Sequence, residues 1–321
     1  MFFLSFSSKQ RIVLTSVVFS ISVLVSLPYS FAQNLKNEQS IPNPKQLVAL
    51  TIAKMDGEVA AGEFVKESLP DYNSTNVYHM MYLPKNYKKG EKYPVIIELT
   101  GNKFPLTGST GRCEDAHLGY CTTLGNDFIW AVAPYIAEGG KELQLNWWGD
   151  EKLTVDYLKK LVDHIVTDYD GDSNNVILCG FSRGSIGVSY IGLCDDEVAK
   201  LWRGFLSHDH FDGQKSWGKS WASDLESYRK EAAVRLKRLD GRQWYLSCNG
   251  RENDYREAIE DMRADKYGEF IYAPFSMEEY INIDGKIIPH AHNDLWPSYD
   301  IAPSTALREW IYRLVGLKVN Y

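Results

Sequence analysis

Apolar residues occur along the chain in short runs that alternate with helical stripes. Residues 93–99 are almost continuously apolar, which is typical of a strand buried on both faces, and residues 127–135 repeat the pattern. Between residues 153 and 166, apolar side chains recur at the three- and four-residue spacing of an amphipathic helix. Two earlier runs, 62–69 and 77–83, predict a pair of opening strands with a turn at Pro70-Asp71.

The same alternation continues to the end of the chain. It predicts strands at residues 176–181, 204–207, 243–248 and 270–283, and helices at 221–239, 255–264 and 304–315. Strands that alternate with helices after an initial hairpin indicate an α/β fold, here a mostly parallel sheet of about eight strands with helices on both faces. We see no internal repeat and no second core, so the sequence predicts one domain over residues 60–321.

The first 32 residues have the pattern of an export signal. Lys9 and Arg11 precede an apolar run over residues 12–27, and Ser30-Phe31-Ala32 supplies small residues before a cleavage site. The run is shorter than the roughly 20 residues that span a bilayer. The cleavage site has no cysteine near it, which argues against a lipid anchor. We therefore expect a signal peptide over 1–32, a flexible leader over 33–59, and a secreted or periplasmic product without a stable membrane anchor.

Charge and cysteine content narrow the function classes. Loss of the signal peptide would change the net charge from −7 to −9, which argues against a nucleic-acid partner. Disulfides are permitted in an exported chain, and Cys113 and Cys121 are the pair that we expect among the five cysteines, the others being Cys179, Cys194 and Cys248. Cys179 precedes a glycine-rich turn and is expected in the core. The cysteine spacing fits no zinc pattern.

The segment with the clearest chemistry is Gly180-Phe181-Ser182-Arg183-Gly184. It lies between a predicted strand and a predicted helix, which is the setting of a nucleophile elbow. Such a turn holds the serine in a strained conformation that lifts its hydroxyl clear of the sheet. The amide that follows the serine begins the helix and faces any oxyanion formed there. The other interpretation is a small-residue turn that only lets helix and strand pack closely.

With these features the chain resembles the α/β-hydrolase superfamily, and within it the esterases that include feruloyl, acetyl-xylan and polyhydroxybutyrate-type enzymes. The resemblance spans roughly residues 77–317. It is carried by Tyr82-Leu83-Pro84, by the run from Tyr93 into Thr100-Gly101-Asn102, by the elbow, and by an acid and a histidine downstream. Such esterases usually have His-Gly where this chain has Thr100-Gly101. The resemblance implies an oxyanion hole made by the amide of Arg183 and one from Gly101 or Asn102.

A serine nucleophile needs a base and an acid, in the superfamily order serine, acid, histidine. Asp254 follows the strand 243–248 and is the expected acid, and Glu252 is the alternative. The purely structural interpretation of Asp254 is an N-cap of the next helix. The base is His292 or His290. The resemblance favours His292, because related esterases have an aromatic residue shortly after the catalytic histidine, as Trp296 would be here. The Arg183 side chain could clamp an acidic substrate or pair with a nearby carboxylate, and we favour the structural pairing.

Two other segments have some features of ion-binding sites. Residues 168–174 place oxygen side chains at alternate positions, as a calcium loop does, but lack its final glutamate and lie where a helix-to-strand turn belongs. Residues 208–212, His-Asp-His-Phe-Asp, resemble a metal cluster, although pocket or capping roles fit a serine hydrolase better. We expect no metal and no cofactor.

The sequence thus predicts an exported serine esterase that uses Ser182, His292 and Asp254. Trp147, Trp148 and Trp217 lie in predicted loops, and Trp221 lies at the start of the predicted helix 221–239. A few aromatic rings there could stack on a sugar, so a small-molecule or polysaccharide-linked ester is the expected substrate. A serine peptidase of the same fold and an inactive hydrolase-like binding protein are the alternatives.

Overall fold

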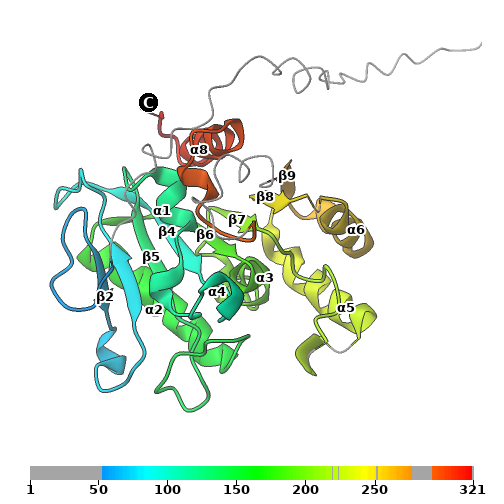
Figure 1. The fold of residues 1–321 in the computed structure, drawn as a ribbon, viewed down its shortest axis with the longest axis horizontal. Coiled ribbons are helices and arrows are strands. Elements are labelled where there is room, and N and C mark those ends of the chain that lie inside the picture. The colour runs from blue at the N-terminus through cyan, green and yellow to red at the C-terminus, as the bar shows by residue number, and fades with distance from the viewer. Residues whose placement is uncertain (1–52, 219, 223, 251, 277–290, 320–321) are drawn as a thin grey trace, which may run out of the picture. The chain divides into compact units, whose positions relative to one another are not determined.

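The described part of the computed structural model, residues 53–218, 220–222, 224–250, 252–276 and 291–319, contains one nine-stranded sheet (Figure 1). Its strands lie in the order β1-β2-β3-β5-β4-β6-β7-β8-β9. Their bounds are β1 Ala53–Lys54, β2 Phe64–Glu67, β3 His79–Tyr82, β4 Tyr93–Leu99, β5 Ile129–Ala133, β6 Gly171–Phe181, β7 Gly204–His208, β8 Gln243–Asn249 and β9 Glu269–Phe275. Only β3 runs antiparallel to its neighbours, β2 and β5. The predicted mostly parallel sheet with an opening hairpin is confirmed.

Side chains of the central strands alternate between two buried layers. On β4, Val95, Ile97 and Leu99 belong to one apolar cluster, whereas Ile96 belongs to another. The first layer holds the buried faces of α2 (Glu151–Asp168), α3 (Arg183–Tyr190), α4 (Asp196–Ala199), α5 (Leu225–Leu236) and α6 (Glu252–Met262). The second holds those of α1 (Leu118–Thr123) and α8 (Ala302–Leu314), which lie together in Figure 1. Helices therefore cover both faces, as the nearly continuous apolar strands require.

Three predicted boundaries shift. β6 begins at Gly171, five residues before the predicted start, directly after the turn that follows α2. α6 begins at Glu252, so Asp254 lies inside the helix and is not its N-cap. β1 lies within the range expected to be a flexible leader, and pairs in parallel with β2 at the sheet edge. The predicted signal peptide, 1–32, and the second half of the strand predicted at 270–283 lie outside the described residues.

The cysteines do not pair as predicted. Cys113 and Cys121 are both buried as separate thiols, so the expected disulfide is wrong. The Cys113 Sγ donates to the carbonyl of Tyr78 at 3.5 Å, while Cys121 lies on α1. Cys179 is completely buried, as its place in the strand predicts.

One polar side chain interrupts the apolar pattern of β4. Glu98 is completely buried, and its carboxylate accepts hydrogen bonds from the amides of Leu118 (3.0 Å) and Gly119 (2.8 Å) and from the Trp130 indole (2.8 Å). It thereby satisfies amides at the start of α1, which have no partner within the helix. Burial, followed by the charge of Asp294, raises the pKa of Glu98 to about 7 despite these donors.

This raised pKa gives a testable pH dependence. A folded-state pKa above the unfolded value of 4.5 means that the folded chain holds the proton more tightly, so the stabilisation is complete below pH 4.5 and is lost as pH rises through 7. We expect the free energy of unfolding to fall by about 3 kcal/mol more between pH 4.5 and 8 in the native chain than in Glu98→Gln. Urea unfolding at several pH values measures the two slopes. Equal slopes would contradict the assignment, whatever the offset between the variants.

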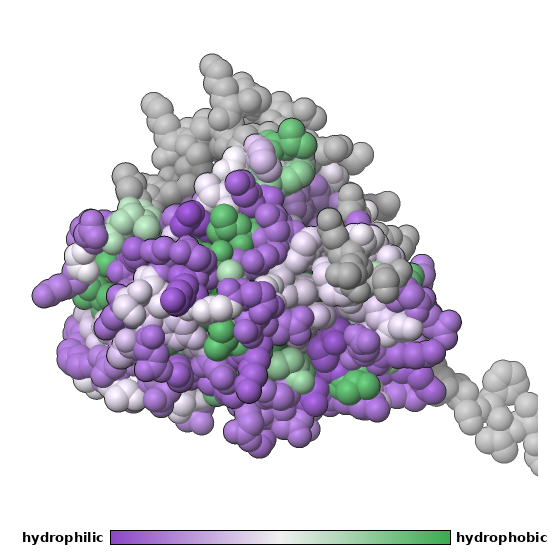
Figure 2. All heavy atoms as spheres, turned by 90° about the horizontal axis from the view of Figure 1, so that it is seen from below, coloured by the Kyte–Doolittle hydropathy of each residue, from purple (hydrophilic) through white to green (hydrophobic). Residues whose placement is uncertain are grey.

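One face of the described surface is mainly hydrophilic (Figure 2). On the face shown in Figure 2, hydrophobic residues form small separate patches among hydrophilic ones. The most exposed of the large apolar side chains described is Leu106, 82% accessible, on the segment after β4. Among the described helices, none combines the length and the apolar character needed to cross a bilayer.

Candidate active site

Ser182 occupies the sharp turn between β6 and α3. Its backbone has φ 56° and ψ −117°, a strained conformation for a residue with a side chain. Its amide donates to the carbonyl of His208 at the end of β7, 3.1 Å away. The turn thus has the geometry expected of a nucleophile elbow, with the serine at the carboxyl edge of the sheet.

The two glycines of the elbow are required by close backbone contacts. A Cβ on Gly184 would overlap the carbonyl oxygen of Leu99 and lie 2.6 Å from its carbonyl carbon. A Cβ on Gly180 would lie 2.9 Å from the Gly184 Cα. α3 therefore starts closer to β4 and β6 than any side chain would allow. The two glycines do let the helix and the strands pack closely, as the alternative interpretation has it. The same close packing also fixes the backbone geometry of Ser182.

His292 connects Ser182 to a buried carboxylate. Its Nε2 lies 3.0 Å from the Ser182 Oγ, and its Nδ1 lies 2.6 Å from the Oδ2 of Asp209. Asp209 is 5% accessible, and its Oδ1 accepts the amide of Asn249 at 2.8 Å. Serine, imidazole and carboxylate therefore form one hydrogen-bonded chain, with the carboxylate fixed from its other side.

The carboxylate differs from the sequence prediction, which placed the acid at Asp254. The His292 ring lies against Phe181, at 4.5 Å between ring centroids, and His210, at 5.6 Å. These contacts place it over the ends of β6 and β7, where Asp209 is the first residue after β7. Asp254 lies five residues beyond β8, on α6. The side chains of Asp254 and Glu252, and all of His290, lie outside the described structure.

The sequence contains a signal for Asp209, although the pattern around it favours a pocket or capping role. Asp209 belongs to the His-Asp-His-Phe-Asp segment, weighed above as a metal cluster or a pocket element, and it satisfies the order serine, acid, histidine as well as Asp254 does. In the structure His210 lines the pocket and Asp212 pairs with Arg235 at 2.9 Å. His210 therefore has a pocket role, and Asp212 has a structural one.

The surroundings of Asp209 favour its charged form. Burial alone would raise its pKa, but the neighbouring His208, the hydrogen bond from His292 and the Asn249 amide outweigh burial and hold the pKa below its usual range. Burial lowers the pKa of His208, whose Nδ1 contacts the Ser247 hydroxyl at 2.9 Å. A carboxylate at Nδ1 keeps the imidazole in the tautomer whose Nε2 can accept the serine proton.

Two amide groups can face an oxyanion near Ser182. The amide of Arg183 opens α3, and none of the hydrogen bonds between described residues uses it or the amides of Gly101 and Asn102. Gly101 lies beside the nucleophile, because a Cβ there would be 3.5 Å from the Ser182 Cβ. Asn102 is held in place, since its Oδ1 accepts the Trp147 amide at 2.8 Å. The substitution of Thr100 for the usual histidine leaves this backbone arrangement possible.

Arg183 pairs with backbone carbonyls, not with the expected carboxylate. Its guanidinium is buried, stacks on the Tyr135 ring at 4.0 Å and donates to five carbonyl oxygens. These belong to Thr100, Gly101, Gly111, Gln144 and Trp147. Burial lowers the pKa of Arg183 to about 10, so the side chain stays charged near neutral pH. The residue after the nucleophile thus ties together two loops beside the site, one after β4 and one before α2.

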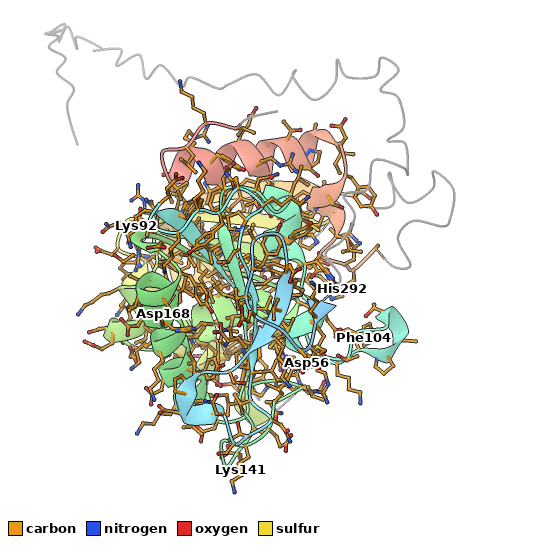
Figure 3. All side chains as sticks on the ribbon, turned by 90° about the vertical axis from the view of Figure 1, so that its left-hand side faces the viewer. Asp56, Lys92, Phe104, Lys141, Asp168 and His292 are labelled. Atoms are coloured by element: carbon orange, nitrogen blue, oxygen red, sulfur yellow. The ribbon has the colours of Figure 1, made fainter. Side chains whose placement is uncertain are left out.

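A pocket of about 510 Å³ opens over Ser182. Its lining includes His292, the aromatic side chains of Phe104, Trp147 and Trp217, and the acidic groups of Glu114, Asp115 and Asp294. Figure 3 shows Phe104 on a segment that projects from the body of the domain on the side where His292 lies. This segment contains the short helix η4, Pro105–Thr107, and forms one rim of the pocket.

The four loop tryptophans divide into two roles. Trp147 and Trp217 line the pocket, with their ring centroids 5.9 Å apart. Trp221 packs behind them against both Trp147 (4.9 Å) and Trp148 (5.1 Å). An aromatic wall supported by further aromatic rings therefore borders the nucleophile.

The turn once weighed as a calcium loop uses its acidic groups locally. Asp170, with φ 57°, accepts the amide of Gly90 at 2.9 Å and the hydroxyl of Tyr87 at 3.2 Å. Asp172 accepts the amide of Asn174 at 3.0 Å. Among the described residues these carboxylates belong to no three-ligand group, and the segment joins the end of α2 to the start of β6, which is the predicted helix-to-strand turn.

Comparisons with known proteins identify the fold of this chain but not its function. No protein-family model matches the sequence, and no curated protein matches it. The solved structure of the AtxE2 isopeptidase is similar at 15% identity and a TM-score of 0.50, over 81% of this chain and 41% of that one. Also similar is a thermostable esterase, at 14% identity and a TM-score of 0.49, over 78% of this chain and 62% of that one. A ferulic acid esterase is similar at 15% identity and a TM-score of 0.42, over 72% of this chain and 97% of that one.

The chain spans less than two thirds of the isopeptidase and of the thermostable esterase. At these identities the likeness shows the fold alone. Together with the strand order and the elbow, it shows that the chain has the α/β-hydrolase fold predicted from its sequence.

Proposed function

We propose that this protein is an exported serine esterase in which Ser182, His292 and Asp209 form the catalytic triad. The observation that carries the proposal is the continuous chain of hydrogen bonds from the Ser182 hydroxyl through His292 to the buried carboxylate of Asp209, at the floor of a pocket. A serine hydroxyl is almost entirely un-ionised near neutral pH, so this arrangement supplies what it needs to attack a carbonyl.

In the reaction, the Ser182 Oγ attacks the ester carbonyl carbon while the Nε2 of His292 takes its proton. The negative charge on the carbonyl oxygen is stabilised by the amides of Arg183 and of Gly101 or Asn102. The bond to the alcohol then breaks, and His292 returns the proton to the leaving oxygen. Water, deprotonated by His292, then attacks the acyl carbon. The bond to the Ser182 Oγ breaks, His292 returns the proton to that oxygen, and the acid is released. Asp209 holds the imidazole throughout.

The shape of the pocket supports an ester with an aromatic or sugar component. Trp147 and Trp217 offer flat surfaces, and Phe104 extends from the rim. Glu114, Asp115 and Asp294 line the same pocket and outnumber its basic side chains, Lys103 and Arg183, which disfavours a negatively charged substrate. We therefore propose a neutral, carbohydrate-linked acyl ester as the substrate class. The predicted signal peptide supports a secreted or periplasmic location.

Covalent labelling tests the nucleophile. A fluorophosphonate probe should modify the native chain at Ser182, as mass spectrometry of the labelled peptide would show, because the probe reacts with an activated serine. Labelling should disappear in Ser182→Ala and persist in Ser109→Ala, which removes another hydroxyl from the pocket lining. Folded native protein that takes no label would instead support the inactive binding protein.

A comparison of substrates separates the two hydrolase classes. We expect turnover of p-nitrophenyl acetate and no measurable cleavage of a matched peptide p-nitroanilide. Preferential cleavage of the amide would support the serine peptidase.

A further inference from the structure

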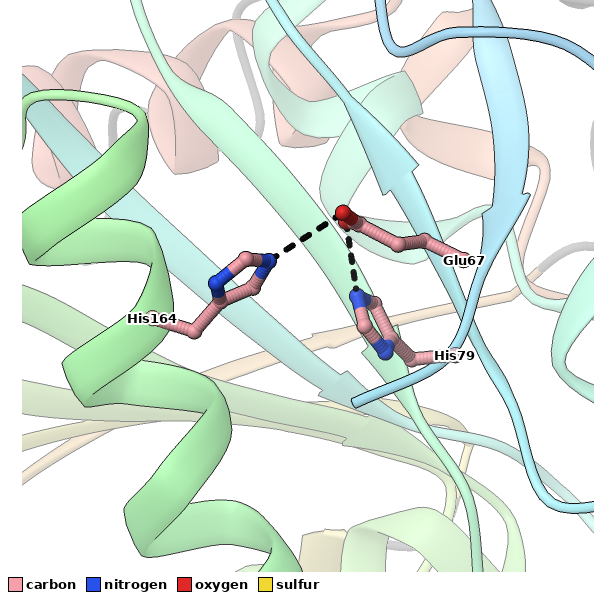
Figure 4. A group of neighbouring side chains, drawn as sticks. All are labelled: Glu67, His79 and His164. Carbon is pink, nitrogen blue, oxygen red and sulfur yellow. Dashed lines mark hydrogen bonds and ion pairs between the residues drawn. The ribbon is translucent and has the colours of Figure 1, made fainter. Parts of the chain in front are cut away.

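A second cluster of reactive side chains lies away from the pocket, between the sheet edge and helix α2 (Figure 4). Glu67 on β2 and His79 on β3 are directly opposite each other across the antiparallel pair. His164 reaches them from α2. One ligand atom from each of the three lies within 4.8 Å of the other two. None of the three lines the pocket over Ser182.

The distances in this cluster match those between the ligands of a tetrahedral metal ion. The Nε2 of His79 and the Nε2 of His164 each lie 3.2 Å from an oxygen of Glu67. Zinc bonds of about 2.0–2.2 Å to nitrogen and oxygen place neighbouring tetrahedral ligands about 3.3–3.6 Å apart. Both separations from Glu67 are therefore close to those around an ion, and the two imidazoles lie near enough for small side-chain adjustments to complete the site, since all three ligand atoms are within 4.8 Å of one another.

The outer contacts also match those of a metal site. Metal-bound histidines usually donate their other ring nitrogen to a carboxylate or another acceptor, which fixes the ring and its tautomer. The Nδ1 of His164 lies 2.6 Å from a carboxylate oxygen of Asp168, and the Nδ1 of His79 lies 2.8 Å from the Tyr157 hydroxyl. The Tyr169 hydroxyl donates to Glu67 at 2.8 Å. Each of the three side chains is thus oriented with its ligand atom toward the others.

We propose that Glu67, His79 and His164 bind Zn²⁺. Two imidazoles and one carboxylate suit zinc, whereas calcium and magnesium prefer oxygen ligands. The cluster is largely sheltered: the side chain of His79 is buried, and those of His164 and Glu67 are 19% and 22% accessible. With neutral imidazoles, the charge of the ion balances the carboxylates of Glu67 and Asp168. Three protein ligands leave one position, which a water molecule from the accessible side can fill.

Bound zinc would fasten the edge of the sheet to the helix layer. β2 and β3 form the opening hairpin, and α2 packs beside the central strand β6. An ion that binds only the folded arrangement stabilises it by mass action. The proposed role is to stabilise the fold, and it does not involve the chemistry at Ser182 because none of the three ligands lines that pocket.

Metal binding to the untagged full chain tests the proposal. After dialysis against EDTA and removal of the chelator, calorimetric titration should show one Zn²⁺ per chain. At 100 times the dissociation constant, Zn²⁺ should raise the Tm by about 5–10 °C. Co²⁺ substituted at the site should give the intense visible absorption of a tetrahedral complex.

Three variants make the test specific. His164→Gln should weaken Zn²⁺ binding at least 100-fold and abolish the cobalt absorption, while Asp168→Asn, which keeps all three ligands, should weaken binding about 10–100-fold. His117→Gln, at a histidine that lines the pocket, should leave binding unchanged. No zinc uptake by the folded native chain, or equal affinity in His164→Gln, would overturn the proposal and leave the cluster as a hydrogen-bonded network.

Discussion

Replacing Asp209 by asparagine should lower kcat/KM for a short ester by roughly 10³–10⁴-fold, with most of the loss in kcat. Asparagine keeps the size of the side chain and can still accept the Asn249 amide. However, when its NH₂ group faces His292 it favours the tautomer that carries its proton on Nε2, beside the Ser182 hydroxyl. That imidazole cannot take the serine proton. Steady-state kinetics with p-nitrophenyl acetate measure the effect.

Asp254→Asn is the matched variant, because it makes the same chemical change at the acid that the sequence suggests. We expect its kcat/KM to stay within about threefold of the native value, because the carboxylate bonded to His292 is Asp209. Thermal unfolding of both variants shows whether either loss reflects unfolding. A large loss in Asp254→Asn with a small one in Asp209→Asn would return the acid to Asp254 and refute the triad proposed here.

Replacing Gly184 by alanine should prevent stable folding, with an expected cost of more than about 4 kcal/mol. The new methyl group would overlap the backbone carbonyl of Leu99 on β4, the central strand that packs against α3. Backbone atoms cannot rotate away as a flexible side chain can, so α3 would have to move off the sheet. Circular dichroism and urea unfolding of the purified variant measure the loss.

Gly101→Ala provides the control for this prediction. Its new Cβ would meet atoms no closer than 3.5 Å, which is ordinary van der Waals contact, and its backbone is not in the left-handed region. The free energy of unfolding should therefore change by less than about 1 kcal/mol. If Gly184→Ala folds with native stability, the close approach of α3 to β4 is not required.

The sequence alone predicted the elements whose signals are local. The alternation of apolar runs and helical stripes gave the α/β class, because strands buried on both faces and helices buried on one face have different periods. The segment around Ser182 predicted the elbow, since a tight strand-to-helix turn needs glycine at fixed positions beside the serine. The base could be limited to His290 or His292, and the resemblance to esterases favoured His292 because Trp296 follows it.

The tertiary structure decided the features that depend on which strand ends and faces meet. Asp209 and Asp254 both follow a strand and both satisfy the order of the triad, and only the position of the His292 ring over β6 and β7 separates them. Arg183 finds carbonyl partners in two loops that are distant in sequence.

The cluster of Glu67, His79 and His164 likewise depends on strand register and on helix packing. Residues 12 and 85 positions apart carry no shared local pattern. Sequence periodicity reports which side of an element is buried, whereas the pairing of side chains from different elements is determined by the packing of the whole domain.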